Sequence, residues 1–313
     1  MIVEQQSPDN SSHSTPYNSL LSLPDKENDS LNPSLPHKDA ATQMELDHRS
    51  PSSEFFKSTT LLNFEPINSS VNSIGNYSNY VAYALGGILK MSSLNFDLAL
   101  KDPTLYENIT SETERYLNSD KKILLLDLDE TLVHADFEGE FPASSYDANI
   151  TFRGNDEQIT VGIFIRNCLN EFLQEVSKEF EIGVFTASKK EYADSVLNYL
   201  DPQNIYFKFR LYRNNCINVN GASIKDLRIF KNSIKYENVV IVDNSMYSFA
   251  NQLSNGILIN SFFNDKTDND LINVMSYLLT YIAHAKDVRE INDQIFHFQE
   301  IFQQISNEYQ KNN

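Results

Sequence analysis

The chain has 313 residues, of which 43 are acidic and 25 are lysine or arginine, and its formal net charge is −18. This charge disfavours direct binding of nucleic acid, because phosphate contacts require lysine and arginine and the sequence contains no basic cluster. Two cysteines, Cys168 and Cys216, are too few for a disulfide framework and are typical of a reducing compartment.

The first 118 residues are predicted to lie outside a packed domain. Residues 1–75 are rich in serine, asparagine, proline and acidic groups, so we predict a disordered acidic tail that cannot offset the entropy of ordering. Residues 76–118 are expected to be a linker with partial helix. The apolar patch at 80–91 is interrupted by Gly86 and Gly87 and is too short for a membrane span. No signal or transit peptide pattern is found, and we expect a nuclear or cytoplasmic protein.

The most informative segment is the apolar run Ile123-Leu-Leu-Leu, which leads directly into two aspartates, Asp127 and Asp129. Such a run predicts a strand buried on both faces of a parallel sheet, and ligands bind beyond the carboxyl ends of these strands. Two carboxylates there indicate a divalent cation and phosphoryl transfer, in which one attacks phosphorus and the other moves protons. Thr131 can hold the loop through its hydroxyl group. The alternative is an aspartate-rich turn that caps the next helix.

Downstream, strand and helix patterns alternate, which predicts a three-layer α/β domain over residues 119–290. The strand patterns indicate a hairpin at 149–152 and 158–165 that returns to the sheet, buried strands at 181–185 and 239–242, and a small antiparallel insert at 204–224. Helical spacing of apolar residues occurs at 169–180, 189–200, 246–253 and 267–285. A last helix at 295–305, within a C-terminal extension at 291–313, is expected to pack on the core.

Polar residues follow two of these strands and one later segment. Thr186 could donate its hydroxyl group to a phosphate oxygen, or cap a helix. Lys225 offers a positive charge to a phosphoryl group, although a single lysine is more often a solvated surface residue. Asp243 and Asn244 provide hard oxygens that suit Mg²⁺, and the same pair is also an ordinary turn signal. Their occurrence in this order favours the functional interpretation.

The segment Asp127-Leu-Asp-Glu-Thr-Leu-Val-His134 closely resembles the first motif of small phosphatases that act on the carboxy-terminal tail of RNA polymerase II. These enzymes belong to the haloacid dehalogenase superfamily. Residues 181–188, 223–227 and 239–245 resemble the second, third and fourth motifs of that superfamily, and the resemblance covers residues 119–290. It implies a three-layer Rossmann-like haloacid dehalogenase fold with a small antiparallel β insert.

The resemblance also implies roles for the motif residues. Asp127 would be the nucleophile and a metal ligand, and Asp129 the general acid and base with its backbone carbonyl on the metal. Thr186 and Lys225 would bind the phosphate group. The remaining ligands would be Asn244 and, in support of the lysine or the metal shell, Asp243. Such an enzyme is a Mg²⁺-dependent protein serine/threonine phosphatase that forms an aspartyl phosphate, and its partner is a phosphoprotein substrate.

The substrate surface is predicted from the same resemblance. Phe137, Ile150 and Phe152 lie where the polymerase-tail enzymes form an apolar pocket for a substrate proline. Arg213 matches an arginine near the substrate path, and an exposed rim arginine is the alternative. Lys189 stands where the family usually has leucine, which weakens the case for the polymerase tail as substrate.

A second departure is Asn167-Cys168, where the family commonly has a proline after the arginine at position 166. This departure does not change any of the proposed catalytic residues. Two further functions stay open: a phosphatase of another phosphoprotein or a small molecule, and a non-catalytic binding module like the related import receptor of the mitochondrial inner membrane. The intact series of motif residues from Asp127 to Asn244 weighs against the binding module.

Overall fold

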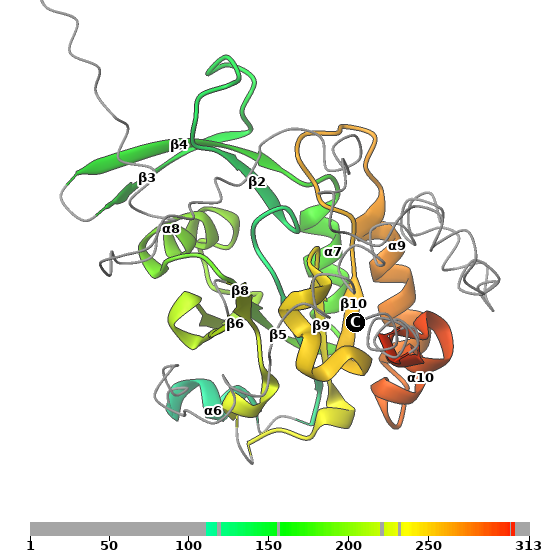
Figure 1. Ribbon diagram of the computed structural model, residues 1–313. Coiled ribbons are helices and arrows are strands. Elements are labelled where there is room, and N and C mark those ends of the chain that lie inside the picture. Colours follow the sequence, from blue (N-terminus) through cyan, green and yellow to red (C-terminus); the bar gives the residue numbers. More distant parts are fainter. Residues whose placement is uncertain are drawn as a thin grey trace, which may run out of the picture.

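The computed structural model describes residues 111–117, 120–154, 157–219, 222–230, 233–300 and 302–303. The predicted tail and most of the predicted linker lie outside these described residues, and the domain boundaries stay predictions. In the described part the chain forms a central parallel sheet, a three-stranded antiparallel sheet, a short hairpin and surrounding helices (Figure 1). The predicted α/β class with a parallel central sheet is therefore confirmed.

The central sheet contains five parallel strands in the order β10-β9-β1-β5-β6. Their bounds are Lys122–Leu126 (β1), Phe180–Phe185 (β5), Phe207–Leu211 (β6), Val239–Asp243 (β9) and Gly256–Leu258 (β10). Side chains of successive strand residues point to opposite faces, and Leu124, Leu125 and Leu126 of β1 are all fully buried. Both faces of the centre of the sheet are therefore covered, as the apolar run predicts.

The second sheet is antiparallel, in the order β2-β4-β3, with bounds Val133–Asp136 (β2), Ala148–Arg153 (β3) and Gln158–Ile165 (β4). It lies at the top of Figure 1, above the central sheet. The predicted hairpin is present, but the prediction that it returns to the main sheet is wrong. Its second strand, β4, pairs instead with β2, because the chain leaves the Asp127 loop directly as a strand.

The predicted insert at 204–224 is only partly correct. Phe207–Leu211 is β6, an edge strand parallel to β5, and only Ile217–Val219 (β7) and Ala222–Ile224 (β8) form an antiparallel pair. Alternation of apolar and polar residues does not distinguish the two cases, because an edge strand with one covered face has the same apolar period as a hairpin strand. Phe209 of β6 stacks on Tyr116, with ring centroids 6.4 Å apart.

Helices surround the sheets. Their bounds are Ser111–Leu117 (α6), Leu169–Val176 (α7), Lys190–Leu200 (α8), Asp270–Tyr277 (α9) and Val288–Phe296 (α10), with a π-helical turn at Leu278–Ile282 (η6). Short 3₁₀ helices occur at Arg213–Asn215 (η2), Leu227–Phe230 (η3) and Tyr236–Asn238 (η4), and a longer one at Met246–Asn255 (η5). None of the described helices combines the length and the apolar character needed to cross a bilayer.

The helix predictions differ from these bounds in identifiable ways. The helix at 189–200 is confirmed, whereas the one at 169–180 ends at Val176 because the chain must turn before the buried start of β5. The segment predicted as a helix at 246–253 is a 3₁₀ helix with non-helical backbone at Phe249 and Gln252. Tertiary hydrogen bonds explain this, since the Gln252 side chain accepts from the amide of Leu227.

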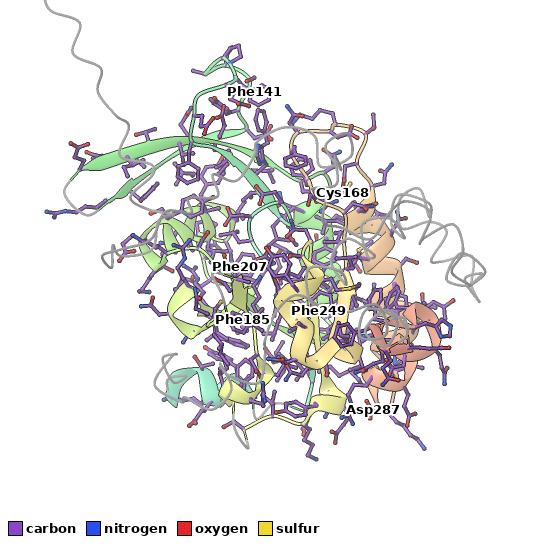
Figure 2. All side chains as sticks on the ribbon, in the orientation of Figure 1. Phe141, Cys168, Phe185, Phe207, Phe249 and Asp287 are labelled. Atoms are coloured by element: carbon purple, nitrogen blue, oxygen red, sulfur yellow. The ribbon has the colours of Figure 1, made fainter. Side chains whose placement is uncertain are left out.

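The sequence predicts a C-terminal helix at 295–305, and the structure bears this out in part: α10 ends at Phe296, and helical backbone resumes at 298–300 and 302–303. His297 adopts a left-handed backbone conformation with φ of 54°, which turns the chain so that Phe298 stacks on Phe296 at 5.2 Å. Both phenylalanines are part of the hydrophobic core, so the segment packs on the domain as expected. Residues 301 and 305 lie outside the described part. Figure 2 shows how densely aromatic side chains such as Phe185, Phe207 and Phe249 fill the interior.

Candidate active site

Three neighbouring strands end at the same edge of the central sheet and bring the predicted polar residues together. The register pairs Leu126 of β1 with Val242 of β9, so Asp127 lies beside Asp243, the last residue of β9. The amide of Asp127 donates to the carbonyl of Val242 at 3.0 Å and fixes this alignment. Thr186 follows β5, the neighbour of β1 on the other side. This edge is where parallel sheets bind ligands.

Lys225 lies between two carboxylates. Its Nζ is 2.5 Å from Asp127 Oδ1 and 2.5 Å from Asp243 Oδ2, and the lysine is 1% exposed. Burial by itself lowers the pKa of Lys225, but Asp127 and Asp243 together raise it above its usual value. Burial raises the pKa of Asp243 to about 6, and the lysine opposes that rise. The lysine is therefore a buried cation, and the solvated-surface alternative is wrong.

Both oxygens of the Asp243 carboxylate accept hydrogen bonds. One oxygen accepts from Lys225, and the other accepts from the amide of Ser245 at 2.7 Å. Of the two roles that the sequence left open for Asp243, this geometry favours support of the lysine over a place in the metal shell.

Two side-chain oxygens lie close to the hydroxyl group of Thr131. Thr131 Oγ1 is 3.3 Å from Asp127 Oδ2 and 3.4 Å from Asn244 Oδ1, so a carboxylate and an amide oxygen converge on one hydroxyl group. Among the described residues, none donates a hydrogen bond to the carbonyl oxygen of Asp129. The same residues contain no group of three or more His, Cys, Asp and Glu that could hold a metal. The mixed oxygen set nevertheless fits Mg²⁺, which takes few protein ligands and keeps several waters.

The side chain of Asp129 points to a different set of partners. Ser188 Oγ donates to Asp129 Oδ2 and the Tyr192 hydroxyl donates to Asp129 Oδ1, both at 2.6 Å. Burial, with help from the charges of Glu130 and Asp127, raises the pKa of Asp129 to about 7, while the two hydroxyl donors oppose the rise. A carboxyl group with such a pKa can both donate and accept a proton near neutral pH.

The turn after β5 is held rigidly. Thr186 Oγ1 accepts from the amide of Ser188 at 3.0 Å, and Thr186 does not cap α8, whose N-cap residue is Lys189. Thr186 Oγ1 donates to none of the residues in the described part, so its O–H is available to donate to a ligand. Arg213 Nε donates to the carbonyl of Ala187 at 2.6 Å, and burial lowers the pKa of Arg213. Arg213 therefore braces this turn.

The predicted pocket residues form an aromatic cluster beside Asp129. Tyr192 contacts Phe137 and Phe152, with ring centroids 5.2 Å and 5.5 Å apart. Ile150 and Phe152 are buried, because α8 packs against β3, while Phe137 is half-buried. In this arrangement only Phe137 of the three predicted residues offers surface to a ligand. Lys189, at the start of α8, is also half-buried.

Four residues that support the site were not identified from the sequence: Ser188, Tyr192, Arg166 and Ser261. Ser188 belongs to the second motif, and Tyr192 follows it by one helical turn, so the helical period offered a signal for both. Arg166 and Ser261 reach the site from distant segments, and no local pattern could have identified them.

The sequence pattern of the family described as NLI interacting factor-like phosphatase matches residues 122–289. CTD small phosphatase-like protein 2 of Dictyostelium discoideum is 40% identical over 172 residues, which cover 55% of this chain and 29% of that protein. CTD small phosphatase-like protein 3 of Caenorhabditis elegans is 40% identical over 170 residues, which cover 54% of this chain and 57% of that protein. Nuclear envelope morphology protein 1 of Saccharomyces cerevisiae is 34% identical over 186 residues, which cover 55% of this chain and 41% of that protein.

Among solved structures, Fcp1, described as an essential RNA polymerase II CTD phosphatase, shares 17% identity and a TM-score of 0.41, covering 63% of this chain and 66% of that one. The chain thus spans less than two thirds of each of the curated relatives named above. The family pattern itself covers more than half of the chain and includes every motif residue from Asp127 to Asn244. The chain therefore belongs to the family of NLI interacting factor-like phosphatases.

Proposed function

We propose that this chain is a Mg²⁺-dependent phosphoprotein phosphatase that uses Asp127 as its nucleophile. The observation that carries the proposal is the contact between Asp127 and the buried ammonium group of Lys225, at the carboxyl end of β1 and close to Asp129. Membership of a phosphatase family supports the reaction class. A structural ion pair alone does not need a carboxyl group with a raised pKa beside it.

The cation would be held by Asp127, by the carbonyl group of Asp129 and by Asn244. Bound Mg²⁺ offsets the repulsion between the anionic nucleophile and the anionic phosphate, and it fixes the orientation of the phosphate. The hydroxyl group of Thr131 supports this assignment, because its single proton lies between the Asp127 and Asn244 side-chain oxygens, 3.3 Å and 3.4 Å away, and keeps them close together.

In the first step an oxygen of Asp127 attacks the phosphorus atom of a phosphoserine or phosphothreonine, and the bond to the serine or threonine oxygen breaks. Asp129 donates its proton to that leaving oxygen, so the alcohol departs uncharged. The product is an aspartyl phosphate on Asp127. Lys225 provides positive charge to the phosphoryl group, and the hydroxyl of Thr186 donates a hydrogen bond to it.

In the second step Asp129, now a carboxylate, takes a proton from a water molecule as that water attacks the phosphorus. The bond between phosphorus and Asp127 breaks, inorganic phosphate leaves, and Asp127 returns to its carboxylate form. The hydroxyl groups of Ser188 and Tyr192, both 2.6 Å from the Asp129 carboxyl group, hold it in place for both proton transfers.

The proposed substrate is a protein phosphorylated on serine or threonine, and the tail of RNA polymerase II is one candidate. Phe137 could contact an apolar residue of the substrate, and Lys189 and Arg213 could contact acidic groups that flank the phosphate. A different phosphoprotein or a small phosphate ester is the alternative substrate. The compartment, nuclear or cytoplasmic, stays a prediction.

The proposal is tested with the purified chain and an aryl phosphate. Hydrolysis is expected with Mg²⁺ and not with a chelator, and Asp127→Asn should abolish it. A phosphoprotein sensitive to hydroxylamine should form in the wild type only. Asp120→Asn, a change at an exposed aspartate, serves as the matched control and should leave turnover unchanged. Normal turnover by Asp127→Asn would refute the assignment of the nucleophile.

A panel of phosphopeptides, each assayed with Mg²⁺ and with chelator, then identifies the substrate class. Peptides with proline after the phosphoserine, peptides with acidic flanks and free phosphoserine form the minimal set. Turnover of free phosphoserine equal to that of both peptides would exclude a phosphoprotein substrate.

A further inference from the structure

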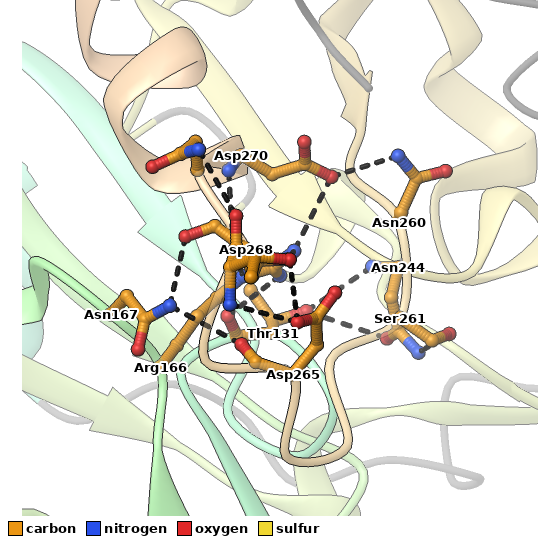
Figure 3. A network of polar contacts seen from close by, with 11 residues as sticks. Thr131, Arg166, Asn167, Asn244, Asn260, Ser261, Asp265, Asp268 and Asp270 are labelled. Carbon is orange, nitrogen blue, oxygen red and sulfur yellow. Dashed lines mark hydrogen bonds and ion pairs between the residues drawn. The ribbon is translucent and has the colours of Figure 1, made fainter. Parts of the chain in front are cut away.

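Arg166 is a buried cation that contacts the loop carrying the proposed catalytic aspartates (Figure 3). It follows β4 directly and is 1% exposed. Its Nε and Nη2 donate to the two carboxylate oxygens of Asp268 at 2.8 Å and 2.7 Å, and its Nη1 donates to the carbonyl of Thr131 at 3.1 Å. A bidentate pair of this kind fixes the plane of a guanidinium group, so its third donor is aimed at one point.

The carbonyl groups on either side of Thr131 also accept hydrogen bonds from distant segments. The amide of Phe262 donates to the carbonyl of Glu130 at 2.8 Å, and the amide of Arg166 donates to the carbonyl of Leu132 at 3.0 Å. Three consecutive carbonyl groups, at 130, 131 and 132, thus accept donors from other segments. Asp129, which precedes them, has a carbonyl group with no donor among the described residues and is the proposed metal ligand.

A second branch of the same network reaches Asn244. Its Nδ2 donates to Ser261 Oγ at 2.9 Å, and the adjacent Asn260 donates to Asp270 at 2.8 Å. Asp270 also lies 3.4 Å from Arg166 Nη2. Figure 3 shows both branches meeting around the guanidinium group. The two proposed side-chain ligands therefore contact one polar network, centred on buried Arg166, through Thr131 and Ser261.

We propose that Arg166, oriented by Asp268, is a positioning residue that sets the geometry of the magnesium site. The proposal rests on the proposed function, since it takes the cation to bind at Asp127, the Asp129 carbonyl and Asn244. Arg166 touches neither cation nor substrate. It acts by holding the carbonyl of Thr131, and with it the hydroxyl group that contacts both Asp127 and Asn244.

The fold offers a control pair with the same bidentate geometry at a more exposed position. Arg289 donates through Nε and Nη2 to the carboxylate of Asp287, at 2.9 Å and 2.6 Å, in the same bidentate manner as Arg166 and Asp268. Asp287 is the N-cap of α10, and its side chain accepts from the amide of Arg289. Loss of this pair should destabilise the fold without changing the magnesium site.

The experiment measures binding of Mg²⁺ to the full chain by calorimetry, and of Mn²⁺ by its electron paramagnetic resonance spectrum. Asp268→Asn and Arg166→Lys should each weaken binding about 10-fold or more, the range found when groups that orient metal ligands are changed. Their effects should not add in the double variant, because Asp268 acts through Arg166. Asp287→Asn should bind both ions with the affinity of the wild type.

Asp268→Asn retains the shape of the side chain, so it keeps the test informative if Arg166→Lys does not fold. Wild-type affinity in folded Asp268→Asn would overturn the inference, and so would an equal loss of affinity in Asp287→Asn. A wild-type chain that binds neither ion would instead refute the metal site of the proposed function. The two failures are therefore distinguishable.

Discussion

Lys225→Met is expected to destabilise the fold strongly, because the ammonium group is the partner of two buried carboxylates. Its Nζ lies 2.5 Å from both Asp127 and Asp243, and the three side chains are at most 9% exposed. Removing one partner of a buried ion pair costs about 3–5 kcal/mol, since the remaining charge is left without compensation. Methionine keeps the apolar stem, so little of the loss comes from a cavity.

The pKa of Asp243 decides where in this range the loss falls. Burial already raises it to about 6 with the lysine present, and loss of the ammonium raises it further. Asp243 then binds a proton near neutral pH and escapes part of the cost of a buried charge. We therefore expect a loss of about 3 kcal/mol in the free energy of unfolding, at the lower end of the range.

The assay is urea unfolding in the presence of a chelator, so that no cation replaces the ammonium group. The control is Lys178→Met, which removes an exposed pair with Glu175 and should cost less than about 1 kcal/mol. Adding Asp243→Asn to Lys225→Met should restore part of the stability, because a neutral amide avoids the remaining cost of burying or protonating that carboxyl group. A loss no larger than that of Lys178→Met, or a further loss in the double variant, would refute the reasoning.

A Cβ atom at Gly183 would lie 2.3 Å from the ring of Phe209, so Gly183→Ala should lower the free energy of unfolding by about 1–3 kcal/mol, measured with urea. Cys168 is exposed, whereas Cys216 is buried and its pKa is raised to about 12. An aromatic disulfide reagent should therefore react with one thiol in the folded protein and with the second only after denaturation, and two thiols that react equally fast would contradict this. Lys189→Leu should raise turnover of a Ser-Pro phosphopeptide relative to one with acidic flanks and leave an aryl phosphate unchanged; equal effects on all three would remove Lys189 from the peptide path.

The strands that carry the proposed site could be predicted from the sequence because their signal is local. An apolar run marks a strand buried on both faces, and the polar residue that follows it lies where parallel strands end. Asp127, Thr186 and Asp243 are all placed at one sheet edge by this rule alone. The rule does not need the identity of the neighbouring strand, because every carboxyl end of a parallel sheet faces the same way.

The supporting contacts could not be predicted, because they join segments that are distant in the chain. The bond from Tyr192 to Asp129 spans 63 residues, and the pair of Arg166 with Asp268 spans 102. A tyrosine on a helix or an arginine after a strand can make many different contacts. Only the packing of α8 brings Tyr192 to Asp129, and only the packing of the loop before α9 brings Asp268 to Arg166. The pairing of β6 with β5 could not be predicted for the same reason, because the alternation of its residues fits an edge strand and a hairpin strand equally well.

The charge of the chain bears on how an acidic protein could bind a phosphate group. At physiological ionic strength the potential of exposed charges is screened over about 8 Å, so most of the 43 acidic residues act only weakly at the site. At the centre of the site Lys225 contacts Asp127 and Asp243, two carboxylates against one ammonium group. This local balance is negative and would repel a phosphate dianion. A divalent cation reverses its sign, which gives the proposed Mg²⁺ a role in binding the substrate as well as in the chemical step.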